Sequence, residues 1–353
     1  MNTTLLSETE VCAAHLLDLV EFDSDSFSMT PIPGGRNNRV FRINSAAGVH
    51  LLKVYFHHPQ DPRDRLANEI AFLRHLERSG CTAAPHLFAC IPDSHSALLE
   101  YVEGTPLALP DVDAECIDQA AQFYLMANTD RSSLAARELP AASEACFSLT
   151  EHLAATQRRV DRLGQILLND EVDCAADLFA RKDIAEVWHS VRVNILAEWP
   201  LRSERSALLP RNERCLSPSD FGFHNALREP GGRLRFLDFE YAGWDDPAKL
   251  VCDFANQPDR LLRHSLSDRF ADVVIAANAN PGELYRRITA LRPLYQVKWA
   301  CICLNDFLQS GRTRREFTSG DVSDNRERRE NQLRRARQML ARATSLQTEH
   351  SFD

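Results

Sequence analysis

The sequence lacks an excess of basic residues, and this absence bears on its partners. Its 353 residues include 41 Lys and Arg against 50 Asp and Glu, a formal net charge of -9 at pH 7. A protein that binds nucleic acid needs a basic surface to neutralise phosphates. We therefore expect no nucleic-acid partner, whereas a cationic or neutral small molecule is compatible with this charge.

The ten cysteines lack the regular pairing of a zinc site or a disulfide framework. None stands in a C-x-x-C pair, and only Cys301 and Cys303 are close in sequence. Metal sites and disulfide-bonded domains both show characteristic cysteine spacing. Most of these cysteines stand among apolar residues, so the sequence predicts buried, reduced thiols.

The sequence also lacks a segment typical of a membrane span or a secretory signal. No apolar run reaches the ~18 residues that a spanning helix needs. The first twenty residues have no basic region ahead of their apolar residues and contain Glu8 and Glu10, unlike a secretory signal. We expect a cytoplasmic protein with no membrane partner. The length and the 44% hydrophobic composition suit one large bilobal unit or two domains.

The first hundred residues carry strand and helix patterns in turn. Residues 8–20 have apolar positions at helical spacing and predict a short helix. From Phe27, three strand patterns separated by the GGRNNR and Ala-Ala-Gly turns predict an antiparallel meander. A helix is expected over 61–79, and a hairpin over 86–90 and 97–102. Together these elements predict a five-stranded antiparallel sheet with one helix.

Two opposite charges in this region fall at positions expected to be buried. Apolar residues of the 61–79 helix form one stripe that begins at Leu66, and Glu69 lies on or beside it. Lys53 stands in the apolar strand LLKVY. Because a buried charge is costly unless it meets an opposite charge, the sequence predicts that Lys53 and Glu69 pair.

Beyond Gly104 the patterns become mainly helical. Helices are expected over 116–126, 148–168, 183–199, 247–257, 266–277, 281–290, 293–309 and 323–345. In the last of these, Arg and Glu interleave beside a narrow apolar stripe, which favours a solvated helix docked at an edge over a segment that binds a partner or nucleic acid. The predicted organisation is an N-terminal helix (1–25), a small lobe (26–104), a helical lobe (105–320) and a charged C-terminal helix and tail (321–353).

The stretch with the most chemistry is LSPSDFGFHN, residues 216–225, followed by LDFEY at 237–241. It brings Asp220, Asn225 and Asp238 onto two short segments joined by a Gly-Gly turn. Phosphoryl transfer needs held phosphates, a placed metal and an oriented acceptor hydroxyl, and Mg²⁺ prefers a few oxygen ligands besides the phosphates. Asp220 is therefore the candidate catalytic carboxylate, and Asn225 and Asp238 are the candidate Mg²⁺ ligands.

Each of these motifs is weak on its own. An Asp-x4-Asn pair commonly forms a capped turn, and a lone strand Lys or helix Glu is commonly exposed. Their order along the chain is more informative. A glycine-rich turn, a strand Lys, a helix Glu, a hairpin, a linker, Asp-x4-Asn and a later Asp follow one another as a kinase fold requires.

Six segments together resemble the aminoglycoside phosphotransferase and choline kinase superfamily: GGRNNRVFRI, LLKVY, NEIAFLRHL, ALLEYVEGTPL, SPSDFGFHNAL and RFLDFEYAGWDDPAKLVCDF. They span about residues 30–254. The resemblance implies an α+β, protein-kinase-like bilobal fold, with a five-stranded sheet and one helix in the small lobe and a larger, mainly helical lobe. It also implies ATP- and Mg²⁺-dependent transfer of the γ-phosphate to a hydroxyl of a small molecule, which is an amino alcohol, a sugar or an aminoglycoside-like compound.

The same resemblance implies roles for individual residues. The nucleotide-binding set is Gly34, Gly35, Lys53, Glu69, Glu100 and Val102. In this set the glycines belong to the loop over the ATP phosphates, Lys53 contacts the α- and β-phosphates and pairs with Glu69, and the last two residues bond adenine through backbone groups. The resemblance also makes Asp220 the catalytic carboxylate and makes Asn225 and Asp238 the Mg²⁺ ligands.

This stretch departs from the family pattern at Pro218 and after Asp238, and its Glu240 points to one branch of the family. Pro218 occupies the place of a bracing His two residues before Asp220. No APE-type activation segment follows Asp238, which argues against a protein kinase. Glu240 in DFEY is closer to choline and ethanolamine kinases than to many antibiotic kinases. A catalytically silent, nucleotide-binding pseudokinase regulator is the alternative function.

Aromatic residues and carboxylates of the helical region are candidates for holding a cationic acceptor. They are Tyr241, Trp244, Tyr285, Tyr295 and Trp299, with Asp245, Asp246 and Asp253. Core packing explains most aromatics of this kind, and Asp246-Pro247 also fits a helix start. The sequence therefore identifies neither the acceptor nor the oligomeric state.

Overall fold

A computed structural model describes residues 3–24, 26–32, 38–57, 63–256, 262–309 and 325–349, and its contacts divide the chain into two compact units. The first consists of Met1–Leu107, Asp118–Ser143 and Leu216–Trp244. The second consists of Ala108–Ile117, Glu144–Cys215 and Asp245–Asp353. Each unit is thus assembled from three separate segments, and the lobe limits expected at residues 25, 104 and 320 stay a prediction.

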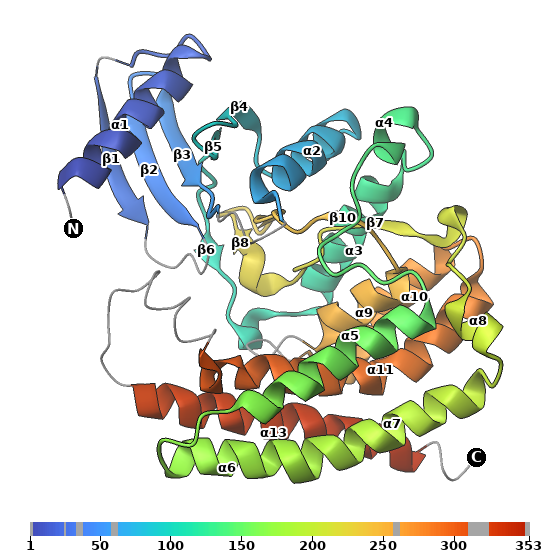
Figure 1. Ribbon diagram of the computed structural model, residues 1–353. Helices are drawn as coiled ribbons and strands as arrows, with labels where there is room; N and C mark the ends of the chain where they lie inside the picture. Colours follow the sequence, from blue (N-terminus) through green and yellow to red (C-terminus); the bar gives the residue numbers. More distant parts are fainter. Residues whose placement is uncertain are drawn as a thin grey trace. The chain divides into compact units, whose positions relative to one another are not determined.

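A five-stranded antiparallel sheet forms the centre of the first unit (Figure 1). Its strands are β1 (Phe27–Ile32), β2 (Arg39–Ser45), β3 (Gly48–Val54), β4 (Leu87–Ile91) and β5 (Ser96–Glu100), in the order β1-β2-β3-β5-β4. The turn between β2 and β3 uses Gly48 at a φ of 122°, a conformation that favours glycine. The predicted meander and hairpin are both present, and the predicted sheet is confirmed.

Two helices cover opposite faces of this sheet. They are α1 (Thr3–Asp18) and α2 (Arg65–Arg78). Leu16 of α1 packs in one core cluster with Leu52 of β3. Because side chains alternate along a strand, Lys53 points to the other face, where it meets Glu69 of α2. The two charges that interrupt apolar patterns in the sequence thus lie inside the unit.

Five short strands and two helices follow the five-stranded sheet in the chain or lie between segments of the first unit. The strands β6 (Thr105–Pro106), β8 (Ala226–Arg228) and β9 (Leu234–Phe236) form one sheet, and β7 (Cys215–Ser217) pairs with β10 (Gly243–Asp245). The helices are α3 (Ala114–Asn128) and α4 (Leu134–Arg137). The β8–β9 hairpin turns at Gly232, whose φ is 86°. This hairpin fixes the distance between the two predicted Mg²⁺ ligands, as described below.

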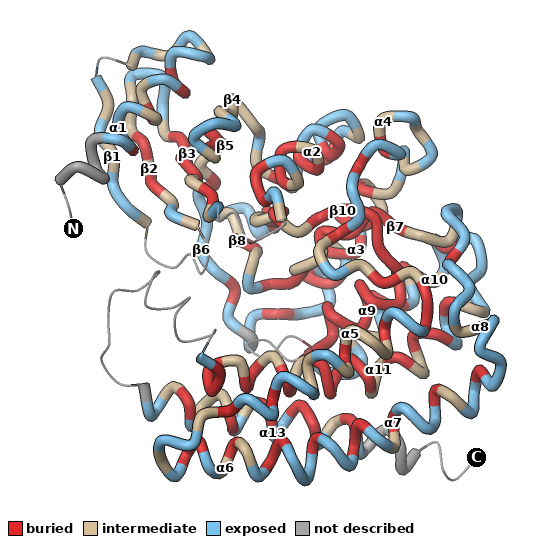
Figure 2. The backbone as a smooth tube through the Cα atoms, in the orientation of Figure 1, coloured by how far each residue is buried: buried red, intermediate tan, exposed pale blue. Residues whose placement is uncertain are grey.

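The second unit is mainly helical. Its helices are α5 (Leu149–Arg162), α6 (Glu171–Phe179), α7 (Ala185–Glu198), α8 (Arg202–Ser206), α9 (Pro247–Ala255), α10 (His264–Ala276), α11 (Pro281–Cys303) and α13 (Asn325–Glu349). Figure 2 shows α9 buried along its whole length. It begins at Asp246, whose side chain accepts a hydrogen bond from the Ala248 N–H at 2.7 Å, and Pro247 occupies the first turn, as the sequence suggested.

Several helix boundaries differ from the sequence prediction: α5, expected to reach 168, ends at Arg162, and two further differences have a clear cause. Pro293 was expected to separate two helices, yet α11 runs through it. Ile288, Leu291 and Leu294 are almost fully buried, and their packing outweighs the one backbone hydrogen bond that proline removes. A π-helical turn over Ala180–Ile184 likewise joins α6 to α7, so the helix predicted to begin at 183 starts earlier.

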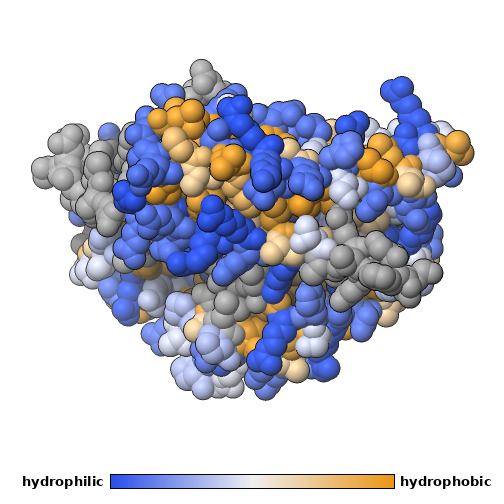
Figure 3. Space-filling view, turned by 90° about the horizontal axis from the view of Figure 1, so that it is seen from below, coloured by the Kyte–Doolittle hydropathy of each residue, from blue (hydrophilic) through white to orange (hydrophobic). Residues whose placement is uncertain are grey.

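The C-terminal helix α13 packs along α11 through a narrow apolar stripe. Leu333, Ala336 and Leu340 of this stripe are buried. Figure 3, seen from below, shows a mainly hydrophilic surface with patches of hydrophobic residues. Among the described residues, no helix combines the length and the apolar character that crossing a bilayer requires. All ten cysteines are free, and seven of them are buried, as the sequence predicted.

Candidate active site

Lys53 binds two carboxylates at once. Its Nζ lies 2.6 Å from Glu69 Oε2 and 2.6 Å from Asp238 Oδ1. Burial alone would lower the pKa of Lys53, but the carboxylates of Asp238, Glu69 and Glu240 raise it well above its ordinary value. The ammonium therefore keeps its proton. The predicted Lys53–Glu69 pair is present, and Asp238 is an additional partner.

Glu69 connects α2 to the segment that carries Asp238. Its second carboxylate oxygen accepts a hydrogen bond from the Phe239 N–H at 3.1 Å. Burial raises the pKa of Glu69, and the Lys53 ammonium opposes that rise. The Phe239 ring packs 5.2 Å from the ring of Phe72, also on α2. Glu69 thus fixes both the lysine and the backbone next to Asp238.

Asp220 follows a tightly held turn at the end of β7. Asn128 Oδ1 accepts a hydrogen bond from the Leu216 N–H at 2.8 Å, and Asn128 Nδ2 donates one to the Leu216 carbonyl at 3.0 Å. Ser219 has a φ of 69°, a left-handed conformation that costs energy for a non-glycine residue, and its N–H bonds Ser217 Oγ at 3.0 Å. The Asp220 side chain remains 40% exposed, so a small molecule has access to it.

His224 supplies the brace that Pro218 cannot provide. Its Nε2 lies 3.3 Å from Asp220 Oδ1, whereas a proline side chain has no hydrogen-bonding group. His224 was not among the site residues predicted from the sequence. The available signal was its position, next to Asn225 and one helical turn after Asp220.

The β8–β9 hairpin brings Asn225 and Asp238 together. Ala226 pairs with Phe236 in the ladder, and the Leu237 N–H donates to the Asn225 carbonyl at 2.8 Å. Asn225 Nδ2 donates to the Asp220 carbonyl at 3.0 Å, which leaves its Oδ1 as the atom suited to a cation. Asp238 has a φ of 66° and a side chain that is 40% exposed.

These two residues fit a magnesium ion. Magnesium binds one or two protein oxygens and takes its other ligands from phosphates and water. Asp238 offers a carboxylate and Asn225 offers an amide oxygen, and both lie on the same hairpin. Within the described ranges, no group of three or more His, Cys, Asp or Glu side chains is arranged for a metal. One carboxylate and one amide oxygen leave the other positions around the ion to phosphates and water, as in an ion that arrives with a nucleotide.

The side chain of Glu100 binds Arg235, which is not one of the predicted nucleotide-binding residues. The Arg235 guanidinium donates to both carboxylate oxygens, at 3.0 Å and 2.6 Å. Burial opposes ionisation, but this guanidinium and the His86 N–H lower the pKa of Glu100. The side chain is thus occupied inside the unit, which is consistent with a backbone-only role. Val102 is buried, and residues 34–35, the two predicted loop glycines, lie outside the described residues.

Most candidates for a cationic acceptor are occupied within the protein. Trp244 is buried, and its Nε1 donates to the Ala136 carbonyl at 2.9 Å. Asp245 pairs with Lys249 at 2.6 Å, Asp246 with His152 and Arg287, and Asp253 with Lys298 at 3.0 Å. Tyr295 is buried and Tyr285 is exposed. Packing and ion pairing therefore account for the carboxylates that the sequence offered as amine ligands.

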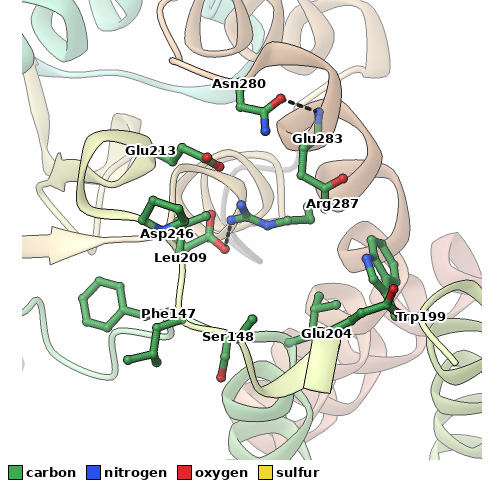
Figure 4. A pocket seen from close by; sticks show the side chains of 14 residues that line it. Phe147, Ser148, Trp199, Glu204, Leu209, Glu213, Asp246, Asn280, Glu283 and Arg287 are labelled. Atoms are coloured by element: carbon green, nitrogen blue, oxygen red, sulfur yellow. Dashed lines mark hydrogen bonds and ion pairs between the residues drawn. The ribbon is translucent and has the colours of Figure 1, made fainter. Parts of the chain in front are cut away.

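The second unit also contains a cavity of about 240 Å³, which the sequence did not reveal (Figure 4). Phe147, Trp199 and several aliphatic residues form its apolar walls. Among the described residues that line it, the one cation is Arg287, which points at Asp246 and pairs with it. The other charged lining residues are Glu204, Glu213 and Glu283. The chemistry of this cavity suits a partly apolar cation.

The five polar residues of the predicted kinase pattern all belong to the first unit: Lys53, Glu69, Asp220, Asn225 and Asp238. Residues 28–291 match the phosphotransferase enzyme family. The chain belongs to this family. The predicted superfamily, fold class and enzyme class, a small-molecule kinase, are thereby confirmed.

Several solved structures share the fold. A choline kinase from Cryptosporidium parvum is 12% identical with a TM-score of 0.56, over 93% of this chain and 91% of the other. The choline kinase LicA from Streptococcus pneumoniae is 14% identical with a TM-score of 0.57, over 95% and 99%. A spectinomycin phosphotransferase, solved with ADP and spectinomycin, is 10% identical with a TM-score of 0.57, over 92% and 97%. No curated protein matches the sequence.

Proposed function

We propose that this protein is an ATP- and Mg²⁺-dependent kinase that phosphorylates a hydroxyl group of a small molecule. The observation that carries the proposal is the position of Lys53, whose ammonium lies 2.6 Å from both Glu69 and Asp238. Binding of a metal–nucleotide complex requires a charged lysine for the phosphates and, next to it, a carboxylate for the metal. All five polar residues of the kinase pattern are present.

Each residue then has a definite role. Lys53 neutralises the α- and β-phosphates, and Glu69 keeps the lysine in place. Asn225 and Asp238 would hold Mg²⁺, which supplies charge neutralisation on the phosphates when bound. Asp220 orients the acceptor hydroxyl and takes its proton as the new oxygen–phosphorus bond forms. The bond between the γ-phosphorus and the bridging oxygen breaks, and ADP leaves with the electron pair.

The acceptor class is part of the same proposal. Among the described residues that line the cavity of the second unit, four are carboxylates and one, Arg287, is a cation, and a cationic ligand complements such a lining. This lining supports an amino alcohol or an aminoglycoside-like compound over a neutral sugar. We further propose a cytoplasmic location and no nucleic-acid partner, on the grounds of composition alone.

An ADP-release screen with amino alcohols, sugars, nucleosides and aminoglycosides tests the proposal. Asp220→Ala should lower turnover about 10²- to 10⁴-fold, the usual contribution of a positioned general base, while MgATP binding persists. Asp93→Ala, at an exposed turn position, is the matched control and should leave turnover unchanged. Full turnover by Asp220→Ala would remove this carboxylate from the mechanism.

A pseudokinase is the second candidate function, and Pro218 is the observation that favours it. Magnesium-dependent ATP binding without ADP release across the whole panel would support this alternative. The contact between His224 and Asp220 argues for the active enzyme, because the catalytic carboxylate is braced in spite of the proline.

A further inference from the structure

Glu240, two residues after Asp238, is almost fully buried. Its Oε2 accepts a hydrogen bond from Asn38 Nδ2 at 2.6 Å, and its Oε1 lies 3.8 Å from the Nε of Arg65, which is buried as well. A buried carboxylate is costly unless it is paired and hydrogen-bonded. These contacts engage both oxygens of Glu240 inside the first unit, so its side chain is occupied by the protein itself.

The orientation of the Asn38 amide follows from its second contact. Asn38 Oδ1 accepts a hydrogen bond from the Phe56 N–H at 3.2 Å. Since an N–H can meet only the oxygen of the amide, the NH₂ group must face Glu240. Asn38 is thus held on one side by the chain after β3 and on the other by the segment that carries Asp238.

Asn38 directly precedes β2, and this position connects it to the site. In the β2–β3 register, Arg39 pairs with Val54 and Val40 pairs with Lys53. Fixing the first residues of β2 therefore fixes the backbone of the lysine that binds Asp238. Arg65 adds a bond to the Phe56 carbonyl at 3.2 Å. The Glu240 carboxylate thus contacts both Asn38 and the first turn of α2, and it does so from the segment that carries Asp238.

We propose that Glu240 is a positioning residue for the nucleotide. Through Asn38 and Arg65 it sets the start of β2 and of α2 relative to Asp238, and thereby the affinity for MgATP. The inference rests on the proposed function. It also gives Glu240 a role that is independent of the acceptor, although in the sequence this residue suggested a particular branch of acceptor kinases.

Reversing the polarity of the hydrogen bond tests the inference. Asn38→Asp places two carboxylates against each other and should raise the Kd for MgATP about tenfold, within the coupling range of contacting residues. Adding Glu240→Gln restores a donor opposite an acceptor, because the new amide donates to the new carboxylate. That carboxylate still accepts the Phe56 N–H, and the pair keeps one negative charge. The double variant should therefore recover most of the lost affinity.

Calorimetric MgATP titration of the full chain gives the readout without a known acceptor, and thermal unfolding is recorded in parallel. Asn44→Asp is the matched control, since it makes the same change near the other end of β2, where the amide makes an exposed hydrogen bond to Ser28 at 3.3 Å. It should leave the Kd unchanged.

Three results would overturn the inference. If the two changes at Asn38 and Glu240 are additive in Kd, the contact does not set nucleotide affinity. If only the melting temperature moves, the contact is structural. Either result leaves the proposed function standing, because the unaltered protein still binds MgATP. If the unaltered protein fails to bind MgATP, the proposed function falls and the inference falls with it.

Discussion

The ammonium of Lys53 lies 2.6 Å from the carboxylate of Asp238, although 185 residues separate the two in sequence. In the free protein this contact joins the group assigned to the phosphates with a group assigned to Mg²⁺. Nucleotide binding must therefore replace or share it. The contact between Lys53 and Glu69, in contrast, need not change when a nucleotide binds. Glu69 is buried, and it bonds both Lys53 and the Phe239 N–H.

Glu69→Gln is the substitution that separates these two contacts. The amide no longer balances the lysine charge, so the ammonium is drawn to Asp238, where it competes with Mg²⁺. We expect kcat/KM for ATP to fall roughly 10- to 100-fold, the effect of about 1.4 to 3 kcal/mol. The Mg²⁺ concentration required for half-maximal rate should rise. Glu77→Gln, on an exposed position of the same helix, should change neither quantity.

His224 is expected to act through Asp220. His224→Ala removes the group 3.3 Å from Asp220, the proposed catalytic carboxylate. It should lower kcat about tenfold, with little change in the KM for ATP, as expected for an interaction made in the transition state. His224→Gln keeps a donor near the same place and should recover part of the loss. His189→Ala, exposed on α7, is the control. An unchanged kcat in His224→Ala would show that the turn alone holds Asp220.

Two of the predicted site residues share one property: each is a charged residue inside a short apolar pattern. Lys53 interrupts an apolar strand and Glu69 interrupts an apolar helix stripe, so burial and pairing follow from local periodicity. The five strands were predicted for the same reason. The Asp220-to-Asn225 spacing is likewise a local motif, and the structure holds its two ends together through the Asn225 Nδ2 bond.

The features that the sequence did not reveal depend on contacts between distant segments. Asn128 stabilises Leu216 from α3, and no pattern around residue 128 distinguishes it from a surface amide. The cavity of the second unit combines residues from four separate stretches of the chain. The predicted helix break at Pro293 was wrong, because the buried neighbours of this proline stabilise the helix and local propensity does not include that packing.

Gly243 provides a test of close packing beside the site. A Cβ there would lie 2.4 Å from the Pro140 carbonyl oxygen and 2.7 Å from the Ala141 carbonyl carbon, and its φ of 158° is unfavourable for other residues. Gly243→Ala should therefore destabilise the protein by about 1–3 kcal/mol or more, the cost of overpacking. Gly231→Ala meets no atom within 4 Å and serves as the control. Equal unfolding midpoints in denaturant for the two variants would contradict this packing.

The pairing of His152 with Asp246 predicts a stability that depends on pH. Burial opposes the charge of His152, but the Asp246 carboxylate, 3.0 Å away, raises the pKa of this histidine to about 9. The pKa in the unfolded chain is about 6.5. Because the folded value is the higher one, the contribution is complete below about pH 6.5 and is lost as the pH rises through about 9.

His152→Gln should consequently remove about 3 kcal/mol of unfolding free energy near pH 6, the equivalent of a difference of roughly 2.5 pKa units. The same substitution should remove little of this pH-dependent contribution near pH 9.5. Denaturant unfolding at both pH values gives the difference between the two proteins directly, and titrations common to both cancel. His264→Gln, at an exposed position, is the control. A difference between His152→Gln and the unaltered protein that is constant over this range would mean that the buried imidazole is neutral, held by Asp246 and by Tyr295, 2.8 Å away, through hydrogen bonds alone.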